Sequence, residues 1–126
     1  MIGFVMVGTN DLDKAIKFYD SMLETINLKR AVTNEKYAGY SSKEGSEDIE
    51  FYVTNPANKE KATYGNGGQI SFIVNSKEKV DKFYNLGIKL GGKDEGGPGI
   101  RPSGEYYCYL RDLDGNKICA FAKINN

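Results

Sequence analysis

Histidine is absent from all 126 residues, and this decides which side chains could do chemistry. Without an imidazole, the chain cannot form a Ser-His-Asp or Cys-His catalytic group or an HExxH zinc motif. Any proton transfer would have to use Asp, Glu, Lys, Tyr or Cys. A metal ion would have to be held by carboxylates, carbonyl oxygens, thiolates and water. Imidazole-dependent enzyme classes are therefore excluded.

Glu50 is the best candidate for a catalytic base. It lies in the segment Asp48–Thr54, where apolar residues alternate with Glu50 and Tyr52 as they do in a half-buried strand. If Glu50 points inward, its carboxylate could hydrogen-bond a ligand or, when buried and unpaired, abstract a proton near neutral pH. If it points outward, it is a solvated surface charge.

Three further residues are candidates for ligand binding. Gln69 begins a strand-like segment and is either a ligand contact or a polar residue at a sheet edge. Arg101 lies in the glycine-rich segment Gly92–Gly104 and is either an anion contact or a solvated loop charge. Cys119 is reactive only if its thiol pKa is lowered; otherwise it is a small buried side chain. A disulfide between Cys119 and Cys108 would span the final hairpin.

Aromatic residues supply the apolar part of any ligand site. Tyrosines crowd the predicted hairpins, where most of them pack and some must line any cleft, which suits a flat or aromatic ligand. Tyr107 and Tyr109 are the candidates for ligand contact, and Phe4 is expected in the cleft wall or the core. The tyrosines of the hairpins are Tyr37, Tyr40, Tyr106, Tyr107 and Tyr109.

Two helices are expected to position these residues. Apolar residues at spacings of three and four predict the first helix, from Asp11 to about Leu23, with Asn10 or Asp11 as its cap. Ser76 is expected to cap the second helix, which runs through residue 86 and ends at Gly87.

Short apolar or alternating segments predict the strands, and two segments rich in glycine and proline are expected to be a linker and a loop. The linker is Pro56–Gly68 and the loop is Gly92–Gly104. The expected strands are Ile2–Gly8, Leu28–Thr33, Tyr37–Ser42, Asp48–Thr54, Gln69–Val74, Ile88–Gly91, Tyr106–Arg111 and Lys117–Ala122.

The order of strand, helix and further strands occurs twice, which indicates an internal duplication. Two related halves would bring equivalent positions together, and concave sites between modules are the usual places for small ligands. Alignment of the first strands and helices, and separately of the closing hairpins, gives the equivalent pairs Phe4 with Gln69, Tyr40 with Tyr109, and Glu50 with Cys119.

Composition limits the partners and the cellular location. The 17 basic and 17 acidic residues cancel, which argues against a nucleic-acid binder. No apolar run approaches the roughly 20 residues of a membrane helix, and the N-terminus lacks the pattern of a signal peptide. Two cysteines make no disulfide framework, so we expect a cytoplasmic protein with no membrane partner.

Three segments resemble the vicinal oxygen chelate superfamily, which contains glyoxalase I, extradiol dioxygenases and bleomycin-resistance proteins. They cover nearly the whole chain in the right order, and the closing Asp-x-Asp-Gly-Asn-Lys-Ile is the most specific. The resemblance is to the small, single-domain glyoxalase-like branch. The segments are TNDLDKAIKFYDSML, PANKEKATYGNGGQISF and GGPGIRP followed by YYCYLRDLDGNKICAF.

The resemblance implies an α+β fold in which two tandem βαβββ modules form curved, mixed, mostly antiparallel sheets around a cleft. One domain would then span residues 1–126, with module one at about 1–55, a linker at about 56–68 and module two at about 69–126. It also implies a homodimer.

Metal-dependent members of the superfamily bind a divalent metal through residues on the first and last strand of each module. The matching positions hold Phe4, Glu50, Gln69 and Cys119, and Phe4 has no donor atom. Without an imidazole, Glu50, Gln69 and Cys119 mix hard and soft donors. We therefore expect no metal or other cofactor, with these three as the candidate ligands if a divalent metal does bind.

The sequence thus predicts a glyoxalase-like protein that has lost the usual metal triad. It would sequester a small molecule or catalyse metal-independent chemistry, with Glu50 as base, Gln69 orienting a carbonyl and Arg101 clamping an anion. The first alternative is a metal-dependent lyase, isomerase or dioxygenase with an atypical ligand set. The second is a non-catalytic interaction module, because fold does not settle function.

Overall fold

The computed structural model describes residues 1–43 and 48–124, and two helices and eight strands make up its regular elements. The first half contains β1 (Val5–Gly8), α1 (Leu12–Glu24), β2 (Lys29–Thr33), β3 (Tyr37–Ser41) and β4 (Phe51–Thr54). The second half contains β5 (Ile70–Val74), α2 (Lys77–Lys89), β6 (Lys93–Ile100), β7 (Tyr106–Arg111) and β8 (Lys117–Ala122).

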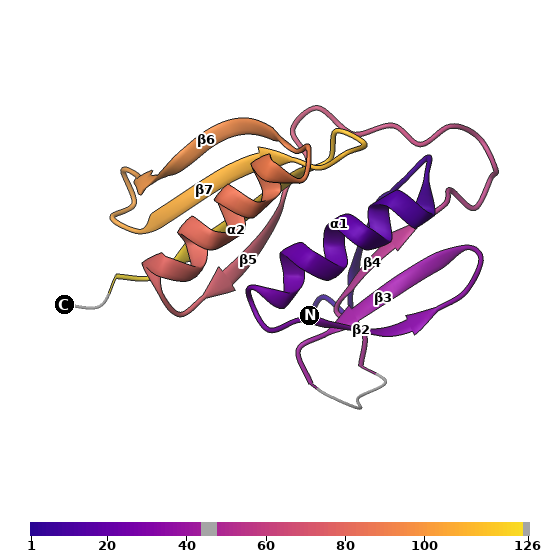
Figure 1. Cartoon of the computed structure of the whole chain (residues 1–126), viewed down its shortest axis with the longest axis horizontal. Helices are drawn as coiled ribbons and strands as arrows, with labels where there is room; N and C mark the ends of the chain where they lie inside the picture. Colours follow the sequence, from indigo (N-terminus) through magenta and orange to yellow (C-terminus); the bar gives the residue numbers. More distant parts are fainter. Residues whose placement is uncertain (44–47, 125–126) are drawn as a thin grey trace.

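Each half forms its own mixed sheet of four strands, in the order β1-β4-β3-β2 or β5-β8-β7-β6. The first strand pairs in parallel with the last, and the remaining pairs are antiparallel. Figure 1 shows α1 and α2 side by side, each lying across the sheet of its own half. The predicted α+β fold of two βαβββ modules is confirmed.

Both helices begin where the sequence places a capping side chain. Asp11 Oδ1 accepts a hydrogen bond of 3.1 Å from the backbone N–H of Lys14, and Ser76 Oγ accepts one of 3.2 Å from Lys79. Each cap satisfies a backbone donor that the first helical turn leaves free.

No helix among residues 1–43 and 48–124 is long and apolar enough to cross a membrane.

The prediction that Gly87 ends the second helix is wrong, because α2 continues to Lys89. A Cβ atom at Gly87 would lie 2.5 Å from Leu110 Cδ1 and 2.8 Å from Met22 Cε, so the glycine is where α2 packs closely on α1 and β7. The chain turns at Gly91 instead, whose φ of +103° favours glycine.

Two further predictions in this region are wrong. The segment Ile88–Gly91 contains the end of α2 and is not a strand. The expected loop contains β6, which pairs with β7 despite its glycines and proline. Register shifts between Asp94 and Gly96 and between Gly96 and Gly99 let the strand accommodate them.

One hydrophobic core joins the two halves. It contains Phe18, Met22 and Phe51 from the first half and Phe83 and Leu110 from the second, all fully or almost fully buried. The ring of Phe51 also meets that of Phe72 on β5 edge-on, at 5.4 Å between centres. Since both helices bury their apolar sides in this core, the opposite face of each sheet is left uncovered by helix.

The turn between β7 and β8 ties the second half to the first. Asn116 Nδ2 donates a hydrogen bond of 2.9 Å to the carbonyl of Gly8 at the end of β1. The backbone N–H of Asn10 donates to Asp114 Oδ1, also at 2.9 Å. Within the turn, Asp112 Oδ1 accepts from the backbone N–H groups of Asp114 and Asn116. The Asp-x-Asp-Gly-Asn motif therefore positions the two modules relative to each other.

Candidate functional site

A groove between the two sheets brings Glu50 and Gln69 together. Its cavity volume is about 550 Å³, and both residues line it. Glu50 immediately precedes β4, and Gln69 immediately precedes β5. The groove therefore lies between the first sheet and β5, which is the edge strand of the second sheet. The full lining is Val5, Ile26, Leu28, Ser42, Glu50, Phe51, Gln69, Ile70, Ser71, Phe72 and Ile73.

Glu50 is solvent-exposed within this groove. Its carboxylate accepts a hydrogen bond of 2.6 Å from the backbone N–H of Ser42. Glu50 is therefore not the buried, unpaired carboxylate that would abstract a proton near neutral pH. An exposed carboxylate held by one backbone donor still offers its remaining lone pairs to a ligand in the groove.

Phe4 and Gln69 occupy equivalent positions, one residue before β1 and β5. Phe4 is 53% exposed, and its ring meets that of Tyr52 edge-on at 5.1 Å. Gln69 is exposed, and its Nε2 donates a hydrogen bond of 2.8 Å to Ser71 Oγ. Phe4 thus presents an exposed apolar ring next to Val5 of the groove but does not line it, while the amide oxygen of Gln69 accepts no hydrogen bond from the described residues.

Cys119 is fully buried on the sheet face away from α2. It lies opposite Ser71 in β5 and Tyr109 in β7. Burial raises the pKa of the Cys119 thiol, and a hydrogen bond with Ser71 opposes this shift only in part. The side chain is therefore a protonated thiol in the wall of the site and not a prepared nucleophile.

Cys108 faces the other side of the same sheet. Its thiol lies 3.8 Å from the carbonyl of Val80 in α2, and burial raises its pKa to about 12. Both cysteines are free. Because Cys108 and Cys119 point to opposite faces of the sheet, the considered disulfide between them cannot form without rebuilding the strands.

The strand register corrects the expected pairing of Glu50 with Cys119. Val5 pairs with Phe51 in the first sheet, whereas Ile70 pairs with Ile118 in the second. Since α1 and α2 keep the same offset as β1 and β5, the counterpart of Phe51 is Ile118. The counterpart of Glu50 is therefore Lys117.

The same register corrects two other pairings. Cys119 corresponds to Tyr52, because each lies opposite the second residue of its first strand. The expected pairing of Tyr40 with Tyr109 is also wrong: Tyr40 is buried in the core, whereas Tyr109 lies on the opposite face of its sheet. The sequence alignment placed four extra residues between the first and last strands of the second module, whereas the strand register, 46 residues from Val5 to Phe51 and 48 from Ile70 to Ile118, leaves only two.

The residues at the superfamily's metal positions do not fit a metal centre. Phe4 offers no donor, and the Cys119 thiol is buried and protonated. Lys117, which is the counterpart of Glu50 in the strand register but not one of these positions, adds a positive charge to the strand that carries Cys119. Within the part of the chain that the structure describes, no three His, Cys, Asp or Glu side chains are grouped to hold a metal ion. Glu50 is the one carboxylate among the positions considered.

Beside the groove, the uncovered face of the second sheet presents three parallel aromatic rings. Tyr107 stacks on Tyr109 at 5.7 Å and on Phe121 at 4.9 Å, each pair with 11° between the ring planes. Cys108 and Leu110 alternate with the two tyrosines and point into the core, so the tyrosines point away from α2. We call Tyr107, Tyr109 and Phe121 the aromatic face.

Arg101 lies over this aromatic face. The carbon of its guanidinium group is 5.4 Å from the centre of the Tyr109 ring, and Nη2 donates a hydrogen bond of 2.6 Å to the carbonyl of Gly97. A Cβ atom at Gly99 would come within 2.8 Å of Arg101 Nη1, and one at Gly96 within 3.3 Å of Nη2. The glycines of β6 therefore leave the space in which Arg101 lies.

Lys117 is a second cation at the aromatic face, and the sequence interpretation did not select it. Its Nζ lies 5.1 Å from the centre of the Tyr109 ring. The sequence does indicate the position of Lys117, because Lys117 and Phe121 each lie two residues from Cys119 and therefore share its face of the strand. Burial raises the pKa of the Tyr109 hydroxyl, which therefore stays a neutral hydrogen-bond donor beside these cations.

The groove and the aromatic face are continuous but are not one enclosed cleft. Ser71 and Ile73 line the groove, and in the sheet they lie opposite Cys119 and Phe121. Of the residues proposed from the sequence, Glu50 and Gln69 line the groove and Phe4 lies next to it. Tyr107, Tyr109 and Arg101 lie at the aromatic face, with Cys119 between the two.

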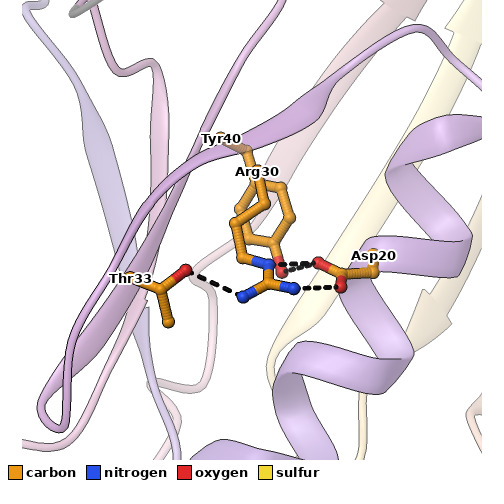
Figure 2. Close-up of polar contacts among 4 residues, drawn as sticks. All are labelled: Asp20, Arg30, Thr33 and Tyr40. Atoms are coloured by element: carbon orange, nitrogen blue, oxygen red, sulfur yellow. Dashed lines mark hydrogen bonds and ion pairs between the residues drawn. The ribbon is translucent and has the colours of Figure 1, made fainter.

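Tyr40 belongs to a structural cluster and not to the site. Its hydroxyl donates a hydrogen bond of 2.8 Å to Asp20 Oδ1, while Arg30 binds both oxygens of Asp20 at 3.1 and 3.0 Å and also donates to Thr33 (Figure 2). Burial and the neighbouring Asp20 raise the pKa of Tyr40 far above its ordinary value. The cluster fastens β2 and β3 to α1.

A larger cavity of about 680 Å³ lies beyond the ends of β1 and β4. Thr9, Lys36, Tyr37 and Lys59 are among its lining residues, together with Glu60. Tyr37 is one of the hairpin tyrosines, but none of the residues proposed from the sequence as a base, ligand contact or metal ligand lines this cavity. Its size therefore does not identify it as the functional site.

Comparison with known proteins agrees with this fold. The family model of the glyoxalase/bleomycin resistance protein/dioxygenase superfamily matches residues 1–120, so the chain belongs to this superfamily. A glyoxalase/bleomycin resistance protein from Albidiferax ferrireducens T118 shares 42% sequence identity with it and superposes with a TM-score of 0.88. That alignment covers 98% of this chain and 99% of the other. No curated protein matches significantly.

More distant solved structures share the fold alone. A glyoxalase-related enzyme from Fulvimarina pelagi is 15% identical with a TM-score of 0.77, over 98% of this chain and 88% of the other. A lactoylglutathione lyase from Agrobacterium tumefaciens is 18% identical with a TM-score of 0.68, over 97% of this chain and 92% of the other. These identities are too low to transfer an activity.

Proposed function

We propose that this protein binds a small organic molecule at the aromatic face and the adjoining groove, without using a metal ion. The observation that best supports this is the set of three parallel rings beside two cations that are only half-buried. Aromatic residues with a few directed polar groups are typical of small-molecule sites. Binding alone suffices for the ligand to be sequestered, so this function requires no metal chemistry.

Metal-independent catalysis at the groove is a second candidate, and one observation favours it. Glu50 and Gln69 line the same cavity, so a carboxylate and an uncharged amide can reach one ligand. Glu50 would take a proton from the ligand while Gln69 hydrogen-bonds its carbonyl oxygen. Arg101 would hold an acidic group of the same molecule.

We also propose that the protein forms a homodimer through apolar residues near the open edges of the two sheets. Phe4, Met6 and Ile73 lie on or beside β1 and β5 and are 53%, 50% and 61% exposed. Ile2 adds to this apolar surface, which a second copy of the chain would cover. Sedimentation equilibrium would test this, with Met6→Lys and Ile73→Lys expected to shift the protein to monomer.

Metal binding is the first experiment, carried out on untagged protein because a histidine tag would supply the ligands that the chain lacks. Elemental analysis and calorimetry with Zn²⁺, Ni²⁺, Mn²⁺ and Fe²⁺ are expected to show no stoichiometric site. Stoichiometric binding that Glu50→Gln abolishes would contradict the proposal and support a metal-dependent enzyme. Binding that Glu50→Gln leaves unchanged would place the metal elsewhere.

Ligand binding is tested with a panel of aromatic and aliphatic fragments, detected by saturation-transfer NMR. Aromatic fragments are expected to bind, and Tyr109→Leu is expected to weaken them about tenfold because it removes a ring from the stack. Tyr64→Leu is the matched control, since Tyr64 is an exposed tyrosine outside the aromatic face. Equal effects of the two variants would contradict the proposed site.

The two candidate functions differ in turnover. A sequestering protein protects one molecule per site and leaves it unchanged, whereas catalysis converts a bound ligand. If the protein is a catalyst, Glu50→Gln should abolish conversion of the bound ligand; if it only sequesters, neither wild type nor Glu50→Gln should convert it. Mass spectrometry of a bound fragment after long incubation with wild type and Glu50→Gln separates the two.

A further inference from the structure

The two cations at the aromatic face are not neutralised by the chain. Arg101 and Lys117 have no carboxylate oxygen within 4 Å among the residues that the structure describes, where the ion pairs are Asp20–Arg30 and Glu95–Arg111. Glu95, which also lies on β6, is thus already paired with Arg111 at 2.8 Å. A protein of zero net charge therefore keeps two free positive charges beside one tyrosine.

Both cations are held in place rather than extended into solvent. Each is half-buried and lies over the Tyr109 ring, at 5.4 Å for Arg101 and 5.1 Å for Lys117. Arg101 is fixed further by its hydrogen bond to Gly97. Since a guanidinium group has five N–H donors, most of those on Arg101 remain free for another acceptor.

The rings beside the cations select for shape. The plane of the Tyr107 ring makes an angle of 11° with the plane of Tyr109 and of 11° with the plane of Phe121, so the three rings stack in one direction. A planar ring can add to such a stack, whereas a bulky aliphatic group cannot match its geometry. The aromatic face and its two cations therefore select a ligand by both its charge and its shape.

We propose that the ligand of the aromatic face is a planar aromatic carboxylate, with its ring against Tyr107, Tyr109 and Phe121 and its acid group between Arg101 and Lys117. The carboxylate would gain charge-assisted hydrogen bonds from the guanidinium and ammonium groups. It would also neutralise Arg101 and Lys117, for which the described residues supply no carboxylate within 4 Å. This inference rests on the proposed small-molecule function and names the class of ligand.

The experiment compares three probes by calorimetry on the full chain. 2-Naphthoate has the ring and the acid, 2-naphthalenemethanol has the ring alone, and cyclohexanecarboxylate has the acid alone. 2-Naphthoate is expected to bind about tenfold or more tightly than either of the others, with an affinity that falls as salt concentration rises. Equal affinity for 2-naphthoate and 2-naphthalenemethanol would overturn the proposal.

Charge-removing variants locate the acid group. Arg101→Gln and Lys117→Gln should each weaken 2-naphthoate about tenfold and leave 2-naphthalenemethanol unchanged. Lys77→Gln is the matched control, because Lys77 Nζ also lies over a tyrosine ring, that of Tyr106 at 5.5 Å, but belongs to α2. Loss of affinity in Lys77→Gln equal to that in the other two would overturn the assignment.

The outcomes separate this inference from the proposed function. Binding of 2-naphthalenemethanol that is lost in Tyr109→Leu, together with no preference for 2-naphthoate, overturns the carboxylate and keeps the aromatic site. Failure of every aromatic probe to bind at millimolar concentration overturns both. Circular dichroism and thermal melts of each variant confirm that a lost affinity is not a lost fold.

Discussion

The hydroxyl of Tyr19 in α1 donates a hydrogen bond of 2.5 Å to Asp112 Oδ2 in the turn between β7 and β8. The two residues are 93 positions apart, and both are buried. Asp112 Oδ2 also accepts from Asn116 Nδ2, whose other hydrogen bond goes to Gly8 at the end of β1. This buried network fixes the relative placement of the modules and therefore the groove between them.

Tyr19→Phe is expected to destabilise the protein by about 1–3 kcal/mol, because it leaves the buried Asp112 carboxylate with one partner fewer. Urea unfolding followed by far-UV circular dichroism measures this. Tyr106→Phe is the matched control, since the Tyr106 hydroxyl donates to Asp81 at a partly buried position. Tyr106→Phe should lower the free energy of unfolding clearly less than Tyr19→Phe does. An equal loss would show that the buried network stabilises the protein no more than a partly buried hydrogen bond.

The pH dependence of stability should carry the signature of Asp112. Burial raises its pKa, although hydrogen bonds from Tyr19, Asn116 and Asp114 oppose that shift. The folded protein therefore binds this proton more tightly than the unfolded chain, so the contribution of Asp112 to stability grows as pH falls and is lost as pH rises through the folded pKa.

Asp112→Asn tests this, because the amide cannot titrate. The free energy of unfolding of wild type minus that of Asp112→Asn should increase as pH is lowered from 7 towards 4, measured by urea unfolding at each pH. Asp114→Asn serves as the control in the same turn. A difference that stays constant with pH would contradict the proton uptake at Asp112.

Sequence periodicity could predict elements whose reasons are local. The caps Asp11 and Ser76 and the strands of the closing hairpin are such cases, and the structure has each of them where the sequence predicts it. Gly87 was misassigned because its role depends on Met22 and Leu110, which contact it from other elements. β6 was missed because pairing with β7 overrides its poor strand propensity.

The site was predictable only in part for the same reason. The sequence indicated Tyr107 and Tyr109 as ligand contacts, but the position of Arg101 depends on the space left by Gly96 and Gly99. Lys117 became the counterpart of Glu50 only when the strand register was known. Register in a duplicated fold depends on the contacts between strands, which residue counting does not contain.

Reactivity of the two cysteines should depend on unfolding. Burial raises the thiol pKa of both Cys108 and Cys119, and neither is exposed. Both should therefore react slowly with Ellman's reagent in native protein at pH 8 and rapidly in 6 M guanidinium chloride. Mass spectrometry after mild oxidation should find no intramolecular disulfide. Rapid native labelling of Cys119 would show that the wall of the site opens, contrary to this prediction.

Gly87→Ala should destabilise the protein, although alanine is intrinsically the better helix former by about 1 kcal/mol. The added methyl group would lie 2.5 Å from Leu110 Cδ1 and 2.8 Å from Met22 Cε, so the ends of these two fully buried side chains would have to shift within the core. Such overpacking typically costs about 1–3 kcal/mol.

Asn85→Ala is the control in the same helix, because Asn85 is exposed and its substitution expresses helix propensity alone. It should leave stability unchanged or raise it slightly, while Gly87→Ala lowers it, both measured by urea unfolding. A double variant with Met22→Ala makes room for the new methyl group. The loss caused by Gly87→Ala should then be smaller in the Met22→Ala background than in wild type. An equal loss in both backgrounds would place the clash elsewhere than at the contact between α1 and α2.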